Sequence, residues 1–215
     1  MKFQVVLFDG FDLMDAIAPF EFFAAAAILS PENVRVELVT AEGKRRVKSG
    51  VNNVEIEATG VIDPNAEGVI LVPGGAGDMY GDGPDSIVTK LKKASETKLK
   101  TLLKKAAQNP NVTLTTVCGG STLLGMMGLL NGRHAVTHHM GMDALPAMGA
   151  RPVHARIVDD GDLVSSGGVT SGIDIAIYTI EQKLGPKIAH YIEKVFEVER
   201  RGTVWSNKGQ EPYLN

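Results

Sequence analysis

The chain has 215 residues, of which 44% are hydrophobic and 22% charged, and its formal net charge at pH 7 is −3. These values are typical of a globular protein and give no sign of binding to nucleic acid or to an anionic membrane. A single cysteine excludes an intrachain disulfide, and the five histidines show no HExxH-type zinc spacing. No apolar stretch is long enough to cross a bilayer, and a strand predicted from residue 3 leaves no room for a signal peptide. We therefore expect a cytoplasmic protein with neither a nucleic-acid nor a membrane partner.

Apolar runs alternate with helical patterns along almost the whole chain. Strands are predicted at 3–8, 34–40, 68–72, 112–117 and 135–137, followed by a hairpin of strands 153–158 and 163–166. Helices are predicted at 13–29, 85–107, 120–128, 141–148, 171–183 and 186–198. This alternation predicts an α/β fold with a mostly parallel sheet that is covered on both faces. No linker or repeat divides the chain, so we expect one domain over residues 1–215.

Glycines cluster where the predicted strands end. They occur at Gly10 and in the segments 73–77, 118–120 and 167–168. The carboxyl ends of parallel strands form the ligand-binding edge of an open sheet, so these loops should meet around one pocket. The segment 73–77 lacks the Lys-Ser/Thr of a phosphate-binding P-loop, which favours a turn that lines an anion or oxyanion site.

The only cysteine, Cys118, follows the predicted strand 112–117 and precedes Gly119, Gly120 and a predicted helix. This order is typical of a nucleophile elbow, in which a strained turn holds the reactive side chain above the sheet. Backbone N–H groups at the helix start predict a stabilised thiolate and a lowered pKa for Cys118. The alternative is a buried cysteine with a structural role only.

A nucleophilic thiol needs a group that manages its proton, and Asp15 is the first candidate. It is an aspartate among apolar residues near the start of helix 13–29, where burial should raise its pKa. The alternative is a carboxylate that caps the helix, a role that Asp12 could share. His138 and His139 follow the strand 135–137 and offer a second candidate base, or a pair of packing residues.

In order and spacing, these motifs together resemble the ThiJ/PfpI superfamily, which has a class I glutamine-amidotransferase-like fold. The resemblance covers nearly the whole chain and is greatest to the isocyanide (isonitrile) hydratase branch and to the amidotransferase-like domains of AraC-type regulators. The motifs that carry it are 8–15 (FDGFDLMD), 19–21 (PFE), 72–75 (VPGG), 117–121 (VCGGS), 128–133 (GLLNGR), 137–138 (TH) and 167–174 (GGVTSGID).

The resemblance implies a flavodoxin-like three-layer sandwich, usually a homodimer, with Cys118 as the nucleophile. Asp15 matches the aspartate of the hydratase branch, where glyoxalase-like relatives carry a glutamate. Gly75 and Gly119 match positions whose N–H groups line the anion site, and we place His138 in the same pocket. The chain departs from the hydratases at Gly119, where they carry a threonine that would assist Asp15. No helix-turn-helix segment follows the matched region, which disfavours the regulator function.

We therefore expect a cysteine-dependent enzyme of the isonitrile-hydratase type that acts on a small molecule without a metal or organic cofactor. In this mechanism the Cys118 thiolate attacks the isocyanide carbon, and Asp15 protonates that carbon and later activates water. The product is an N-substituted formamide. The alternatives are glyoxalase-like or amidase chemistry on the same thiol, or a non-catalytic redox sensor or ligand-binding protein. The missing threonine strengthens both alternatives.

Overall fold

A central sheet of eight strands forms the middle layer of the computed structural model, which describes residues 1–210 and 213. In chain order its strands are β1 (Lys2–Val6), β2 (Arg35–Thr40), β5 (Gly60–Val61), β6 (Gly68–Val72), β7 (Val112–Thr116), β10 (Ile157–Asp159), β11 (Leu163–Ser166) and β12 (Val204–Ser206). They lie in the order β12-β10-β11-β7-β6-β1-β2-β5, and every neighbouring pair except the β10–β11 hairpin is parallel. The predicted mostly parallel sheet is confirmed.

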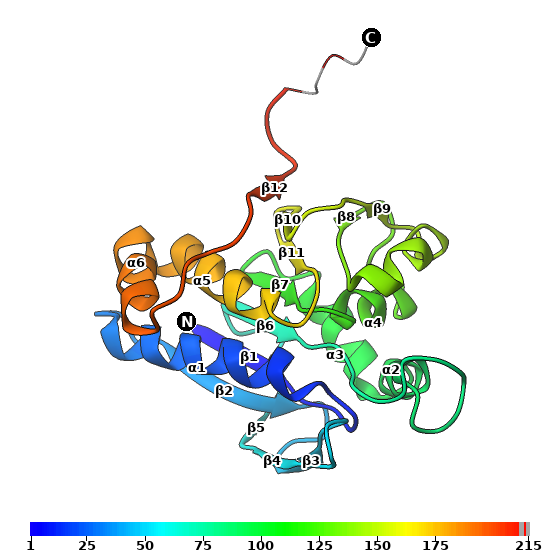
Figure 1. Ribbon diagram of the computed structural model, residues 1–215. Helices are drawn as coiled ribbons and strands as arrows, with labels where there is room; N and C mark the ends of the chain where they lie inside the picture. The colour runs from blue at the N-terminus through cyan, green and yellow to red at the C-terminus, as the bar shows by residue number, and fades with distance from the viewer. Residues whose placement is uncertain (211–212, 214–215) are drawn as a thin grey trace.

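Helices cover both faces of this sheet (Figure 1). They are α1 (Leu13–Leu29), α2 (Ile87–Ser95), α3 (Lys98–Ala106), α4 (Gly120–Met126), α5 (Ser171–Leu184) and α6 (Pro186–Val195). Helices α1, α5 and α6 pack together on one face, and α2 packs against both α3 and α4 on the other. This arrangement confirms the predicted three-layer α/β fold.

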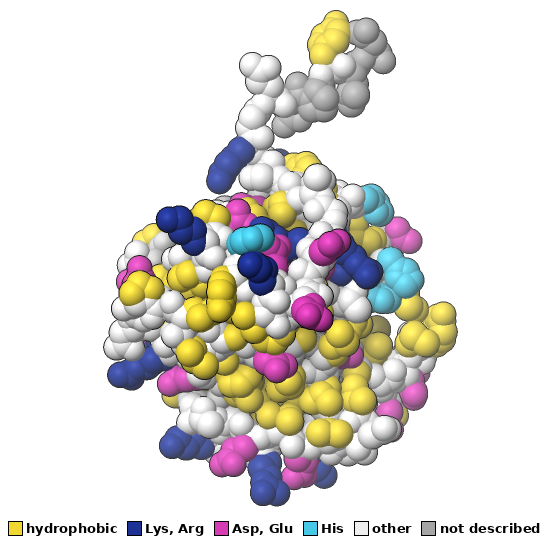
Figure 2. Space-filling view, turned by 60° about the vertical axis from the view of Figure 1, so that its left-hand side comes forward, with side chains coloured by type: hydrophobic (Ala, Val, Ile, Leu, Met, Phe, Trp, Pro, Cys, Tyr) yellow, Lys and Arg dark blue, Asp and Glu magenta, His cyan; other side chains and the backbone are white. Residues whose placement is uncertain are grey.

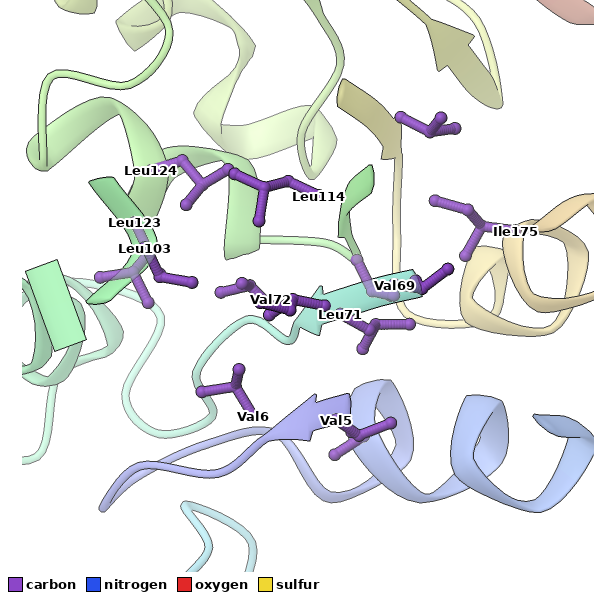
Figure 3. Close-up of a cluster of buried hydrophobic side chains, with 14 of the residues drawn as sticks. Val5, Val6, Val69, Leu71, Val72, Leu103, Leu114, Leu123, Leu124 and Ile175 are labelled. Atoms are coloured by element: carbon purple, nitrogen blue, oxygen red, sulfur yellow. The ribbon is translucent and has the colours of Figure 1, made fainter. Parts of the chain in front are cut away.

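The core lies on the two faces of the central strands, because helices exclude water from both sides of them. All five residues of β6 are buried, as expected for a strand in the middle of a parallel sheet. Figure 3 shows Val5 and Leu71 on the side of α1 and α5, and Ile175 of α5 points toward Val69 on the same side. On the other side, Leu103 and Leu123 of α3 and α4 lie near Val72.

Several predicted elements differ in the structure. The helix predicted at 85–107 is two helices: the first ends at Ser95, and Thr97 caps the second by accepting the N–H of Leu99. The strand predicted at 135–137 is the short β8 (His134–Ala135), which pairs with β9 (Arg151–Pro152) outside the main sheet. Of the strand predicted at 153–158, only the end belongs to β10.

Two further segments were predicted wrongly or missed. Residues 141–148 form two 3-10 segments, His139–Ala144 and Pro146–Met148, because Pro146 lacks an N–H and interrupts the α-helical pattern. The antiparallel hairpin β3 (Arg45–Lys48) and β4 (Glu55–Ala58) was not predicted, and its largely charged residues explain why.

The loops that follow β1, β6 and β7 all leave the same edge of the sheet, because these three neighbouring strands are parallel. They carry the segments 8–15, 73–77 and 117–120 respectively. The fold therefore brings the three segments that contain most of the candidate site residues together at this edge of the sheet. Among the residues that the structure describes, no helix has the length and apolar character that crossing a membrane requires.

Candidate active site

Cys118 lies on a strained turn between β7 and α4, as the elbow pattern predicts. Its φ of +54° is in the left-handed region, which a non-glycine residue occupies at a cost of about 1–3 kcal/mol. The surrounding chain fixes this conformation: the Cys118 N–H donates to Gly167 O at 2.8 Å, and the Thr137 hydroxyl donates to Cys118 O at 2.8 Å. Gly120 is required for packing, since a Cβ there would lie 2.2 Å from Val72 O.

Asp15 is buried beneath the elbow with no exposed surface. Its Oδ2 accepts the Gly74 N–H at 2.9 Å, whereas its Oδ1 has no hydrogen-bond partner in the described part of the chain. The carboxyl group also interacts with the Cys118 thiol. The cap of α1 is Asp12, whose Oδ1 accepts the N–H groups of Met14 and Asp15. Asp15 is therefore not the helix cap that the sequence offered as the alternative role.

Burial raises the pKa of Asp15 to about 8, and the negative charge of Asp12 adds to this effect. The Gly74 N–H and the Cys118 thiol act in the opposite direction, but they are weaker. A buried carboxylate with one unpartnered oxygen is costly, so the carboxyl group keeps its proton at neutral pH. This agrees with the raised pKa expected from the apolar neighbours of Asp15 in the sequence.

The lowered thiol pKa expected from the sequence is wrong. Burial of Cys118, which is 8% exposed, raises its pKa above the ordinary value, and the adjacent Asp15 adds to the rise. The Gly119 N–H lowers the pKa, but by less. The glycines and the predicted helix start in the sequence correctly indicate this N–H donor. They do not show how far the thiol is removed from water. Near neutral pH, Asp15 and Cys118 form a pair in which both groups are protonated.

A pocket of about 350 Å³ opens above the Cys118 thiol. Three residues predicted for the site, Gly75, Gly119 and His138, line this pocket together with Cys118. Asp15 does not line it and lies behind the thiol. Most of the remaining lining is apolar or glycine: Ala76, Gly77, Met79, Ile87, Val88, Leu91, Met140, Gly141 and Val169.

Two backbone N–H groups beside the thiol suit an oxyanion. The Gly119 N–H is directed at Cys118, and the Gly75 N–H has no acceptor among the described residues. The two segments are close, since a Cβ on Gly119 would lie 3.8 Å from Gly75 N. Gly119 itself has φ −66° and ψ −2°, so the backbone does not require glycine there. The missing threonine hydroxyl is therefore a chemical difference and not a conformational necessity.

His138 lines the pocket but is not positioned as the base of Cys118. Its Nδ1 accepts the Met140 N–H at 3.4 Å, and its pKa is lowered by burial and by neighbouring His139. A neutral ring that accepts at Nδ1 carries its proton on Nε2 and offers a donor. No hydrogen bond joins His138 to Cys118 among the described residues.

Sequence reasoning missed three residues that complete the site. Gly74 supplies the hydrogen bond to Asp15, Thr137 fixes the Cys118 carbonyl, and Thr122 lines the pocket. The sequence gives no periodic signal for them, because each acts through a single contact across loops. Within the described residues, no group of three or more His, Cys, Asp or Glu side chains is arranged to hold a metal ion.

The site and fold agree with comparisons against known proteins. Residues 1–182 match the model of the DJ-1/PfpI family. An isonitrile hydratase of Pseudomonas putida is 40% identical over 129 residues, which are 60% of this chain and 51% of that protein. The HTH-type transcriptional regulator CdhR of Pseudomonas aeruginosa is 27% identical over 202 residues, 92% of this chain and 55% of the regulator. The chain thus spans about half the length of these curated relatives.

Solved structures show the same fold. A ThiJ/PfpI family protein from Pseudomonas syringae superposes with a TM-score of 0.77 at 24% identity, over 93% of this chain and 76% of that one. Drosophila melanogaster DJ-1beta gives 0.73 at 17% identity, over 92% of this chain and 98% of its own. With the strained cysteine between β7 and α4 and the match over residues 1–182, the chain belongs to the DJ-1/PfpI family.

Proposed function

We propose that this protein hydrates small, uncharged isocyanides to N-substituted formamides, with Cys118 as nucleophile and Asp15 as acid and base. The observation that carries this proposal is the buried Asp15–Cys118 pair, which holds its protons near neutral pH and whose thiol lines an apolar pocket. No lysine or arginine lines the pocket among the described residues, which favours substrates without a negative charge. The 40% identity to an isonitrile hydratase supports the same reaction.

The first step adds the thiol across the terminal carbon of R–N≡C. This carbon carries a lone pair and takes up a proton as sulfur bonds to it. Asp15 gives its proton to the carbon and takes the proton of the thiol, so the carboxyl group ends the step protonated. The product is a thioformimidate, S–CH=N–R, on Cys118. The protonated Asp15–Cys118 pair provides both the proton and the sulfur nucleophile that this step requires.

The second step adds water to the thioformimidate. The water oxygen bonds to carbon, and one proton reaches the nitrogen through Asp15, giving a tetrahedral intermediate with an N–H. The C–S bond then breaks, the hydroxyl proton returns to sulfur, and R–NH–CHO leaves. The N–H groups of Gly75 and Gly119 are placed to stabilise negative charge on oxygen in this step.

The alternatives fit the site less well. A redox-sensing cysteine reacts as an exposed thiolate, whereas Cys118 is buried and its pKa is raised. Glyoxalase-like and amidase reactions also begin with thiolate attack on a carbonyl carbon that takes up no proton. A protonated thiol beside a protonated carboxyl group favours the isocyanide.

Formamide production from an alkyl isocyanide tests the function. We expect turnover by the wild-type protein and none above background with Cys118→Ala, since removing a covalent nucleophile costs at least about a thousandfold. Parallel arms measure methylglyoxal consumption and peroxide oxidation of the thiol by mass spectrometry. Turnover of methylglyoxal without isocyanide turnover, or rapid oxidation with neither activity, would replace this proposal with the corresponding alternative.

We also infer a homodimer, as the family resemblance implies, formed through the face of α1 and α6. Figure 2 shows hydrophobic side chains gathered on this side of the molecule. Ile28 is 84% exposed, and Tyr191 and Val195 are more than half exposed. Sedimentation at micromolar concentration should give twice the monomer mass, and Val195→Lys should shift it toward the monomer. A wild-type monomer under these conditions contradicts the inference.

A further inference from the structure

A pair of threonine hydroxyls links the pocket to the nucleophile. Thr122 lies four residues after Cys118, in the first turn of α4, and lines the same pocket. Its Oγ1 lies 3.0 Å from Thr137 Oγ1. The Thr137 hydroxyl in turn lies 2.8 Å from Cys118 O. Thr122 is therefore connected to the elbow but is not used in the steps described above.

The direction of these hydrogen bonds follows from the groups involved. A carbonyl oxygen only accepts, and a hydroxyl has one proton to give. Thr137 gives its proton to Cys118 O, so Thr122 must be the donor to Thr137. Thr122 Oγ1 accepts no hydrogen bond from the described residues, so this hydroxyl can act toward the pocket as an acceptor.

The absence of a side chain at Gly141 leaves Thr122 Oγ1 accessible from the pocket. Gly141 also lines the pocket, and a Cβ there would lie 3.2 Å from Thr122 Oγ1. The other polar side chains of the lining are Asp12, His138 and Cys118 itself. His138 offers a donor and Cys118 is the nucleophile, so Thr122 and Asp12 are the acceptors. Asp12 Oδ1 already accepts two N–H groups at the start of α1, whereas Asp12 Oδ2 accepts none from the described residues, so Asp12 is the competing acceptor that the experiment must test.

We propose that Thr122 accepts a hydrogen bond from the N–H that forms on the substrate nitrogen when water adds to the thioformimidate. This inference rests on the proposed isocyanide hydration. The isocyanide and the thioformimidate have no hydrogen on nitrogen, whereas the tetrahedral intermediate and the formamide have one. The hydrogen bond is thus absent from the bound substrate and present later, which is the kind of interaction that accelerates a reaction. Thr122 selects ligands with one N–H beside the carbon that bonds to sulfur.

The test compares Thr122→Val, which keeps the shape and loses the hydroxyl, with Thr122→Ser, which keeps the hydroxyl. One neutral hydrogen bond contributes about 1 kcal/mol, so Thr122→Val should lower kcat/KM for an alkyl isocyanide by about five- to tenfold. Inhibition by an N-alkylformamide and by its N-methyl derivative gives the second readout. The preference for the N–H compound over the methylated one is the ratio of their inhibition constants. This preference should be several-fold larger in the wild type than in Thr122→Val, and Thr122→Ser should show the wild-type preference.

A purely structural role for Thr122 would lower turnover in Thr122→Val but leave the preference for the N–H compound unchanged, and that result overturns the inference. It is also overturned if Asp12→Asn, and not Thr122→Val, removes the preference. The proposed function fails separately: it fails if the wild type forms no formamide from isocyanide. The inhibitor comparison on the folded protein then still decides whether Thr122 recognises an N–H.

Discussion

Replacing Asp15 with asparagine is expected to lower kcat for isocyanide hydration by about a hundredfold or more, the usual scale for a lost acid–base group. The amide matches the protonated carboxyl group in shape, and its oxygen can still accept the Gly74 N–H. It cannot give a proton to the isocyanide carbon or receive one from Cys118. The measurement is formamide production at saturating isocyanide. Turnover within a fewfold of the wild type would contradict the role of Asp15.

The free energy of unfolding provides the control for this variant. The raised pKa of Asp15 fixes the direction in which this free energy changes with pH. Its pKa is about 8 in the folded protein and about 3.8 in the unfolded chain. A group with a raised folded-state pKa stabilises the protein fully below the unfolded pKa, and this contribution is lost as pH rises through the folded pKa. The wild-type free energy of unfolding should therefore fall between about pH 4 and pH 8. Asp15→Asn lacks this loss, so urea unfolding should show it to be folded and less sensitive to pH over this range.

Elements with strong local signals were predicted well. The helix predicted at 13–29 is α1 (Leu13–Leu29), and the strand predicted at 68–72 is β6 (Gly68–Val72). Both have apolar patterns that tertiary contacts reinforce. The predicted helix 85–107 fails because leucines at helical spacing occur on both sides of Thr97, so that periodicity does not show the break. The segment 135–137 is buried, and burial alone does not place a segment in the main sheet.

The site was predictable as far as it depends on the order of elements along the chain. Asp15 follows β1 and Cys118 follows β7, and these strands flank β6 and run parallel to it, so the fold class alone brings the two residues to one edge. The roles of Gly74, Thr122 and Thr137 depend on single hydrogen bonds between loops, for which the sequence has no repeated pattern. The thiol pKa was predicted in the wrong direction for a related reason. Helix starts and glycines are visible in a sequence, whereas the extent of desolvation is a property of the packed structure.

The pH dependence of kcat/KM should report the proton on Asp15. We expect a nearly constant value below about pH 7 and a decrease above about pH 8 that approaches tenfold for each unit, because the reactive form keeps the proton on the carboxyl group. The other titratable groups that face this region do not account for that decrease. The pKa of His138 is lowered, so the ring is already neutral there, and the pKa of Cys118 is raised beyond this range.

Asp12→Asn identifies the group that titrates. Asparagine caps helices as well as aspartate does, so the start of α1 should be retained while the charge is removed. The Asp12 charge opposes ionisation of Asp15, so its removal lowers the pKa of Asp15 and moves the midpoint of the decrease in activity to measurably lower pH. The matched control is Glu21→Gln, which removes a charge from the exposed face of the same helix and should leave the midpoint in place. Asp15 is not the titrating group if Asp12→Asn leaves the midpoint unmoved, or if both variants move it equally, since only Asp12 adjoins the buried carboxyl group.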